Sequence, residues 1–544
     1  MNKPKYYKNA GQVFILVFLT MAIIPALLPA QPAAQDQPGR VGATLDAANA
    51  PAVAARRAKL MEAHKDAVII IPSQFRARDE LRDNLNFLYL TGLQEPDAVL
   101  VLDPGGSPRE TLFRRRTGGQ GTIGGTRGPE TMGVAGDGAR TGVGIGMSAG
   151  AWAAGAVAST AAGAGSVRAG QSQAGAIPGP GQAQEPTDNM LTEKPIAQLS
   201  STLRSLAMSD RAKRVFLPFS DLDFLSRTFG ATNPLAQSEA ILNVDPTLLE
   251  MRLTKDTDEI QALREAIDLT AEALNEAFRA AEPGFREVDL AAILRYAFNK
   301  RETKDSFLQA ASGPNSTNVH FGATARALAT GDLVVFDVGS YVRSYTSDIS
   351  RTIPANGRFT KEQRAIYGLV LEAQKEGCRR LVPGVTFKPV QDEVETILMA
   401  GLEKLGLVTD LKSPWQKRLY IQHGFGHGIG LDVHDAWSWH NPRLDKVAMA
   451  PGMVMTMEPG LYFPEVRFEA FLEALKGKVP DAELAAFRQK AGPVYNRYAG
   501  MGVRIEDDIL ITANGNEILS SRVPKEIADI ERLMREKSPH NLLK

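Results

Sequence analysis

Two short stretches near the C-terminal end decide the fold: Gln422-His423-Gly424-Phe425-Gly426-His427-Gly428-Ile429-Gly430 and Arg504-Ile505-Glu506-Asp507-Asp508. Three carboxylates elsewhere can join them, namely Asp337, Asp348 and Glu458. Two Asp, two Glu and one His then form a set able to hold a pair of divalent cations. Oxygen-rich ligation with one imidazole suits Mn²⁺, Co²⁺ or Zn²⁺ better than a metal that prefers thiolates. Because the ligands come from distant segments, a folded domain must gather them, which indicates an enzyme.

The composition is that of a globular protein with two or three domains. The chain has 544 residues, of which 44% are hydrophobic and 23% charged. Its 62 Lys and Arg balance its 62 Asp and Glu, and it has no dense basic tract, so we expect no nucleic-acid partner. The single cysteine, Cys378, excludes a disulfide framework, and we expect it to be buried filler rather than a nucleophile.

The N-terminus has the pattern of a secretory signal peptide over residues 1–34. Lys3, Lys5 and Lys8 precede an apolar run over residues 13–28, and small residues follow it. The apolar run is short for a membrane span, which needs about 20 residues. We therefore expect cleavage near residues 30–34, export of the mature protein, in a bacterium to the periplasm, and no stable membrane span after cleavage. The alternative is that the segment is retained as an N-terminal anchor.

Residues 50–246 read as an α/β N-terminal domain. Residues 56–64 and 195–208 are helix-like, and four runs are strand-like: 67–72, 86–92, 98–103 and 214–217. From residue 117 to residue 184 the chain consists mostly of Gly, Ala, Ser and Thr. Such a segment buries too little apolar surface to offset its ordering entropy, so we expect a flexible insertion. A tether or surface-binding arm is the alternative interpretation.

Residues 247–544 form the second expected domain, which opens with an amphipathic helix over residues 256–281. A faint repeat lies within it, because Gly331 to Gly339 aligns with Gly452 to Gly460. In each copy a glycine precedes an apolar strand, and a carboxylate follows six residues after that glycine: Asp337 in one, Glu458 in the other. The repeat predicts two related halves with the site between them.

Spacing alone leaves more than one interpretation of the local geometry of the candidate ligands. We expect Asp337 to end an apolar strand and to meet Asp348 across a two-stranded hairpin, where two carboxylates so close would protonate or bind a cation. Two unrelated surface acids are the alternative for this pair. His423 and His427 are four residues apart, but the glycines between them disfavour a helix and permit close backbone approach. The spacing does not match a nucleotide-binding loop.

Five ordered motifs resemble those of the aminopeptidase P and prolidase family of dimetal peptidases. They are Val335-Phe336-Asp337-Val338-Gly339, Ser347-Asp348-Ile349-Ser350-Arg351-Thr352, His423-Gly-x-Gly-His427-x-x-Gly-Leu-Asp-Val-His434-Asp435, Met457-Glu458-Pro459-Gly460-Leu461-Tyr462 and Val503-Arg504-Ile505-Glu506-Asp507-Asp508. The resemblance runs from about residue 247 to the end and extends more weakly to residues 87–92 and 95–100 of the N-terminal domain. The insertion departs from the family pattern.

The resemblance implies an α+β "pita-bread" catalytic domain with pseudo-twofold halves and two divalent ions, usually Mn²⁺. It assigns Asp337 to one ion and His427 and Glu458 to the other, and it makes Asp348 and Glu506 bridging ligands. The ions would acidify a water molecule and polarise the scissile carbonyl. The resemblance also implies a homo-oligomer, a dimer or a tetramer.

Other positions acquire roles from the same resemblance. Glu458 could also serve as general base, His320 would lie near the substrate amine and leaving group, and His434 would stabilise the tetrahedral intermediate. Residues around the pocket for proline would be His423, Tyr462 and Arg504. His440, between Trp437 and Trp439 in sequence, has no firm counterpart and reads equally well as packing or as pocket rim.

The leading functional hypothesis is a Xaa-Pro aminopeptidase, which releases the N-terminal residue of peptides that carry proline second. A Xaa-Pro dipeptidase is the close alternative, since it uses the same metals but requires a free carboxylate after proline. Export favours the aminopeptidase, because shed or imported peptides vary in length. A non-catalytic or creatinase-like relative is disfavoured because all five ligands are present, and methionine aminopeptidases lack the extra N-terminal domain.

Overall fold

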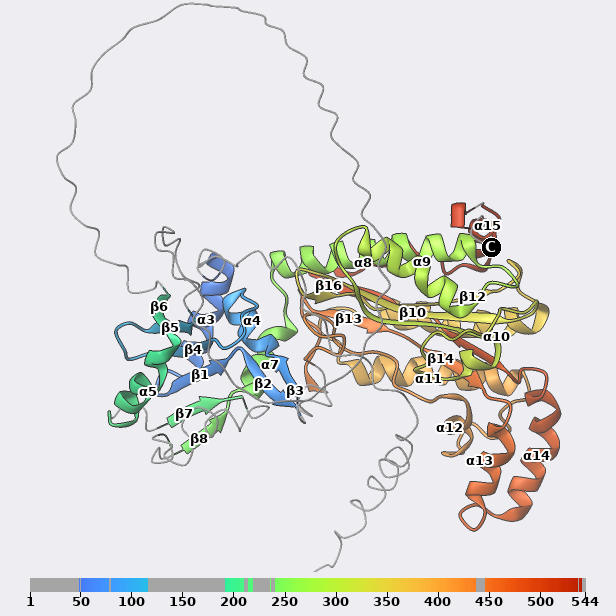
Figure 1. Ribbon diagram of the computed structural model, residues 1–544. Coiled ribbons are helices and arrows are strands. Elements are labelled where there is room, and N and C mark those ends of the chain that lie inside the picture. The colour runs from blue at the N-terminus through green and yellow to red at the C-terminus, as the bar shows by residue number, and fades with distance from the viewer. Residues whose placement is uncertain are drawn as a thin grey trace, which may run out of the picture.

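The computed structural model describes residues 48, 50–77, 80–115, 191–209, 214–218, 235, 240–436, 446–536 and 538–540 (Figure 1). The expected signal peptide over residues 1–34 and the expected insertion over residues 117–184 lie outside these residues. The same is true of Trp437, Trp439 and His440. Within the described segments, no helix combines the length and the apolar character that a membrane crossing requires.

The N-terminal domain is built on a six-stranded mixed sheet with the strand order β6-β5-β4-β1-β7-β8. Strand β1 pairs antiparallel with β4 and parallel with β7, which confirms the α/β class. The elements are α3 (Pro51–Ala63), β1 (Val68–Pro72), β2 (Gln74–Ala77), β3 (Glu80–Asp83), α4 (Leu85–Thr91), β4 (Val99–Leu102), β5 (Glu110–Arg114), β6 (Thr192–Pro195), η1 (Ile196–Gln198), α5 (Leu199–Ala207), β7 (Arg214–Leu217) and β8 (Ala240–Asn243).

The strand expected over residues 86–92 is wrong, because this segment forms helix α4. The Asn84 side chain accepts a hydrogen bond from the Asn86 backbone N–H at 3.0 Å, which caps the helix at its start. Gly92, with φ +68°, ends it in the left-handed conformation that only glycine adopts cheaply. The aromatic and β-branched residues suggested a strand, but these two end signals outweigh that local propensity.

The second domain places its strands between helices. Helix α7 (Asp245–Leu253) leads into this domain, and the expected boundary between residues 246 and 247 falls within it. Figure 1 shows α8 and α9 along one side of the strands and α11 along the other. The remaining elements are α8 (Thr257–Ala280), α9 (Glu287–Asn299), β9 (Asp305–Ser312), η5 (Gly313–Thr317), β10 (Leu333–Val342), β11 (Tyr345–Thr346), β12 (Ile349–Pro354), α10 (Lys361–Arg380), α11 (Phe387–Lys404), α12 (Gln416–Tyr420), β13 (Val454–Met457), β14 (Gly460–Phe463), α13 (Arg467–Leu475), α14 (Asp481–Tyr495), β15 (Met501–Arg504), β16 (Asp507–Thr512), β17 (Gly515–Ile518) and α15 (Ile527–Leu533).

The sheets of this domain divide as the repeat predicted. Strand β10 lies between β9 and β12, antiparallel to both, while β13, β16 and β17 form a second sheet and β14 pairs with β15. Gly331 and Gly452, which precede β10 and β13, have nearly equal φ values of +93° and +91°. Asp337 and Glu458 therefore follow turns of the same conformation, one in each half.

The helix pairs repeat as well. The turn between α8 and α9 contains Gly284, and the turn between α10 and α11 contains Gly384, with φ +96° and +86°. The Gly284 N–H donates to the Leu328 carbonyl at 2.9 Å, and the Gly384 N–H donates to the Met449 carbonyl at 2.9 Å. Leu328 and Met449 each stand three residues before the glycine that precedes the central strand. Two copies of one helix–helix–strand unit therefore build the domain, which confirms the pseudo-twofold α+β expectation.

Candidate metal centre and substrate pocket

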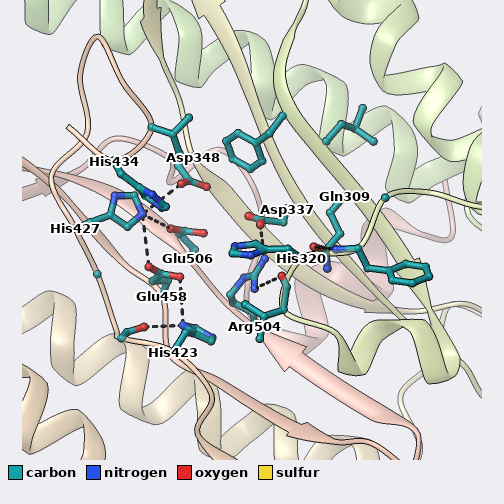
Figure 2. Close-up of a pocket in the computed structure, with 18 residues that line it drawn as sticks. Gln309, His320, Asp337, Asp348, His423, His427, His434, Glu458, Arg504 and Glu506 are labelled. Atoms are coloured by element: carbon teal, nitrogen blue, oxygen red, sulfur yellow. Dashed lines mark hydrogen bonds and ion pairs between the residues drawn. The ribbon is translucent and has the colours of Figure 1, made fainter. Parts of the chain in front are cut away.

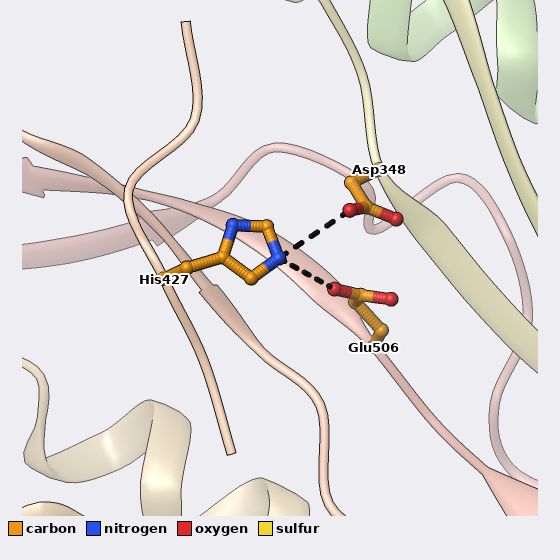
Figure 3. A group of neighbouring side chains, drawn as sticks. All are labelled: Asp348, His427 and Glu506. Carbon is orange, nitrogen blue, oxygen red and sulfur yellow. Dashed lines mark ion pairs between the residues drawn. The ribbon is translucent and has the colours of Figure 1, made fainter. Parts of the chain in front are cut away.

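Three candidate ligands from separate segments meet between the two halves. Asp348 lies just before β12, His427 lies in the glycine-rich segment before β13, and Glu506 lies between β15 and β16 (Figure 3). Their ligand atoms all lie within 4.8 Å of one another, and all three residues are buried. His427 Nε2 is 3.5 Å from Asp348 Oδ2 and 3.9 Å from Glu506 Oε1. The arrangement is that of a cation site.

Glu458 extends this group from the other side of the imidazole. It directly follows β13, where its backbone N–H donates to the Phe425 carbonyl at 2.9 Å. Its Oε1 lies 3.5 Å from His427 Nε2, and its Oε2 lies 3.5 Å from His423 Nδ1. One carboxylate therefore contacts both histidines of the glycine-rich segment.

Asp337 lies in the same pocket but outside that tight group. The expected strand end at Asp337 is wrong, because β10 continues to Val342, whereas the expected hairpin is present and pairs Asp337 with Ser350 of β12. Asp337 Oδ1 accepts a hydrogen bond from the Ser350 hydroxyl at 2.7 Å, and Oδ2 forms an ion pair with Arg504. The Arg504 guanidinium thus compensates the charge of this carboxylate.

Ser350 is a site residue that motif reasoning did not single out. Its fully buried hydroxyl lies 2.7 Å from Asp337 Oδ1 and 2.8 Å from Glu506 Oε2, and it accepts from Arg504 Nε at 2.7 Å. It therefore couples two candidate ligands. The available signal was the alternation of the strand, which puts Asp348 and Ser350 on one face.

The glycines near His427 are required for close approach to β13. A Cβ atom at Gly426 would lie 2.3 Å from the Thr456 carbonyl oxygen, closer than real Cβ atoms come. Thr456 in turn fixes the backbone of His427. The Thr456 N–H donates to the His427 carbonyl at 2.8 Å, and the Thr456 hydroxyl accepts from the His427 N–H at 3.0 Å. The segment is extended against β13 rather than helical, as its composition indicated.

Burial and crowding set the protonation of the group. Burial raises the pKa of the Asp348, Glu458 and Glu506 carboxyls well above their ordinary values, and the neighbouring carboxylates raise it further. Burial, with smaller contributions from the neighbouring imidazoles of His434 and His423, lowers the pKa of His427 to about 3. The imidazole is therefore neutral at physiological pH, which is the form that binds metal. The carboxyls hold protons that a bound cation would displace.

Two of the candidate ligands each keep a buried oxygen that has no hydrogen-bond partner among the described residues: Asp348 Oδ1 and Glu506 Oε1. Unsatisfied buried oxygens are uncommon in folded proteins and call for an ion or another explanation. A divalent cation satisfies both oxygens and removes the repulsion between the carboxylates. The donor set therefore fits the metal chemistry that the sequence predicts.

The group opens into a pocket of about 640 Å³ (Figure 2). The pocket is lined partly by the candidate ligands and partly by apolar side chains, among them Phe307, Leu308 and Phe321. His320, His423, His434 and Arg504 line it too, as does Gln309, which the motifs did not indicate. All five expected ligands and the three expected pocket-facing histidines thus share one cavity.

Tyr462 is not among the lining residues and lies behind Arg504. Its fully buried hydroxyl accepts from Arg504 Nη1 at 3.1 Å and lies 2.8 Å from His423 Nε2. Burial raises its pKa to about 12. Tyr462 thus joins two residues of the pocket wall from behind.

His434 lies edge-on to His427, with ring centroids 4.4 Å apart and an interplanar angle of 77°. Its neighbour Asp435 is buried and forms an ion pair with Arg252 at 2.6 Å, and its backbone N–H donates to the Gly428 carbonyl at 2.9 Å. These contacts fix the segment that carries His434 at the pocket edge.

Comparison with known proteins agrees with this geometry. Residues 261–513 match metallopeptidase family M24, and residues 53–123 match the aminopeptidase P N-terminal domain. A Xaa-Pro aminopeptidase of Haemophilus influenzae is 38% identical over 300 residues, which cover 54% of this chain and 64% of the relative. A human Xaa-Pro dipeptidase is 30% identical over 312 residues, which cover 53% of this chain and 61% of the relative. The matched part therefore spans less than two thirds of either relative.

A solved structure extends the likeness to both domains. Aminopeptidase P from E. coli with the inhibitor Pro-Leu superposes with a TM-score of 0.64 at 26% identity. The superposition covers 89% of this chain and 97% of that one. With its two domain matches, its duplicated pita-bread fold and its buried cluster of carboxylates and imidazole, this chain belongs to the aminopeptidase P and prolidase family of M24 metallopeptidases.

Proposed function

We propose that the chain is a dimetal Xaa-Pro aminopeptidase, which hydrolyses the bond between an N-terminal residue and a following proline. The observation that carries the proposal is the buried group of Asp348, His427 and Glu506, with two carboxylate oxygens that lack partners. The likeness to a Xaa-Pro aminopeptidase supports the choice of reaction.

Five side chains would hold the two ions: Asp337, Asp348, His427, Glu458 and Glu506. When bound, divalent ions polarise a carbonyl and lower the pKa of water. Mn²⁺ is the proposed ion, and Co²⁺ or Zn²⁺ would suit the same donors. Asp337 also pairs with Arg504 through Oδ2 and accepts a hydrogen bond from Ser350 at Oδ1, and each of these oxygens keeps a further lone pair for an ion.

The chain's own residues supply the proton transfers. Glu458 reaches into the pocket between His423 and His427, where it accepts a proton from the attacking water. His320, exposed on the pocket wall, donates to the substrate near the scissile bond. His434 at the edge of the group stabilises the oxyanion.

The proline side of the pocket is formed by His423, Arg504 and, behind them, Tyr462. A proline amide has no N–H and its ring fixes φ, so recognition depends on shape and on groups that surround the ring. The apolar side chains of Phe307, Leu308 and Phe321 suit this ring. Proline-containing peptides are the proposed substrates.

A Xaa-Pro dipeptidase is the second candidate, and the likeness to the human dipeptidase supports it. The two activities differ in whether a chain after proline is accepted. The test is to purify the protein, measure its bound metal, and assay Ala-Pro against Ala-Pro-Ala-Ala with Mn²⁺. Cleavage of the longer peptide supports the aminopeptidase, cleavage of Ala-Pro alone supports the dipeptidase, and no cleavage of either overturns both.

Export and assembly form a separate part of the proposal. Residues 1–34 carry the pattern of a signal peptide, so we propose an exported, periplasmic protein that has lost this segment. N-terminal sequencing of the protein from fractionated cells tests it, and an intact Met1 would contradict it. A homo-oligomer, either a dimer or a tetramer, is proposed from the family and is tested by light scattering.

A further inference from the structure

The segment that carries His320 has little hydrophobic anchorage. None of the residues from Asn318 to Thr324 has a buried side chain, and His320 itself is exposed. A loop with few buried apolar contacts is ordinarily mobile. A side chain that contacts substrate needs a fixed position, so polar contacts must supply the order.

Both ends of this loop are held by one carboxylate, Glu287, which is the first residue of α9 and is fully buried. Oε1 accepts hydrogen bonds from the Ser312 N–H at 2.6 Å, from the Ser312 hydroxyl at 2.7 Å and from the Asn315 amide at 3.0 Å. Oε2 accepts from the Thr324 N–H at 3.0 Å and from the Thr324 hydroxyl at 2.6 Å. Five donor groups, from residues on both sides of His320, thus converge on one side chain.

The donor count matters because Glu287 has no ion-pair partner among the described residues. Arg326, nearby, donates to the Ser312 hydroxyl at 2.6 Å and forms its ion pair with Asp332. A buried carboxylate that makes no direct ion pair depends on hydrogen bonds to replace its lost hydration. The burial of the Glu287 carboxylate and the order of the loop therefore depend on the same hydrogen bonds.

Contacts between the two anchored ends then place the His320 backbone. The Val319 carbonyl accepts from Arg504 Nη1 at 3.1 Å, and the Phe321 N–H donates to Gln309 Oε1 at 3.0 Å. The residues on either side of His320 are thus held by Arg504 and Gln309. Figure 2 shows His320 between these two side chains. These contacts form only if the loop ends lie where Glu287 holds them.

We propose that Glu287 is a positioning residue, which holds the loop over residues 312–324 so that His320 points into the substrate pocket. The inference rests on the proposed function, because His320 contacts substrate only if the pocket binds peptide. The hydrogen bonds of Glu287 go to Ser312, Asn315 and Thr324, and within the described part of the chain none joins it to the five candidate metal ligands. Its removal should therefore act on the loop and spare the metal.

The primary variant is Glu287→Gln, which keeps the shape but replaces one oxygen with an NH₂ group. The donors of Ser312 or those of Thr324 then face another donor, so one end of the loop is released. In the metal-loaded protein, hydrogen exchange of residues 312–324 should rise, and bound metal should not change. The kcat for Ala-Pro-Ala-Ala should fall about 10²-fold, the loss expected when a reacting group is misplaced by about 1 Å.

The matched control is Asp289→Asn, which lies in the same first turn of α9. Its carboxylate binds the Arg286 backbone and guanidinium and does not contact the loop. Loss of helix capping alone would therefore affect both variants, whereas the proposal expects normal kcat and normal loop exchange in Asp289→Asn. Should Glu287→Gln fail to fold, Thr324→Val removes one donor and Thr324→Ser restores it, so the serine variant should recover the kcat that the valine variant loses.

The double variant Glu287→Gln/His320→Ala separates positioning from other effects. The proposal expects it to be as active as His320→Ala alone, within the factor of about two by which independent effects scatter. A multiplicative loss, reduced metal content or an unchanged kcat in Glu287→Gln would overturn the proposal. Failure of the proposed function would appear separately, as a wild-type protein that does not cleave Ala-Pro-Ala-Ala.

Discussion

Metal loading should release protons from this protein, because the carboxyls that would hold the metal are buried close together and retain protons in its absence. In the metal-free protein, burial and mutual repulsion raise the pKa of the Asp348, Glu458 and Glu506 carboxyls. His427 has a lowered pKa of about 3 and carries no proton to lose at neutral pH. A divalent cation binds carboxylates in their charged form, so the carboxyl protons must leave.

The repulsion is large enough to retain a proton near neutral pH. The ligand atoms of Asp348 and Glu506 lie within 4.8 Å of each other, which for two unit charges at an effective dielectric constant of 20 costs at least about 3.5 kcal/mol. Each of the three raised carboxyls can release a proton on loading, so a titration at pH 6 should show a net proton release. Calorimetric titration with Mn²⁺ in buffers of different ionisation enthalpy measures the number.

The released number should fall as the pH of the titration rises, because the carboxyls lose protons before metal arrives. Asp348→Asn removes one of the three groups and should release fewer protons than wild type. If wild-type protein bound two ions at pH 6 without any proton release, the carboxyls would be ionised before loading. The account of the site as a repelling group that a cation neutralises would then be wrong.

Four other predictions follow from the site and the sequence. Folding lowers the pKa of His423 and His427 and raises that of Glu506, so well above the ordinary histidine pKa of about 6.5 only the carboxyl binds its proton more tightly in the folded chain. The Tm of chelator-treated protein should therefore fall as the pH rises from there through the raised carboxyl pKa, and a flat or rising Tm would contradict the pKa directions. Glu506→Ala should abolish turnover and lower metal content by emission spectrometry, and the ligand assignment fails if both metals and near-normal rates remain. His320→Ala should keep both metals and lose 10²–10⁴-fold, roughly, in kcat/KM; an unchanged rate with full metal removes His320 from the mechanism. Deletion of residues 118–181 should leave activity and thermal stability largely intact. About 13 residues remain between Arg114 and Thr192, and they can span roughly 40 Å. A large loss of activity or of stability would show that the deleted segment packs on the core.

Several elements were predictable because their signals are local. The helix expected over residues 256–281 is α8, and its capping box between Asp256 and Glu259 lies within four residues of sequence. The strand expected over residues 67–72 is β1, whose continuous apolar run suits a central strand buried on both faces. The strand expected over residues 86–92 is wrong, because a short segment rich in apolar residues fits both helix and strand. The helix is decided by its two ends, where Asn84 lies before the segment and Gly92 is its last residue.

The ligand chemistry and the internal duplication were predictable from residue types and spacing, since the intervals from Gly331 to Asp337 and from Gly452 to Glu458 are read directly along the chain. Which groups touch depends on how the folded elements pack. The Ser350 hydroxyl between Asp337 and Glu506, and the pairing of Arg504 with Asp337, join residues more than 150 positions apart. The convergence of both ends of the His320 loop on Glu287 arises in the same way. The physical reason is that a buried polar group must find partners wherever the packed elements present them, and spacing along the chain carries no record of that choice.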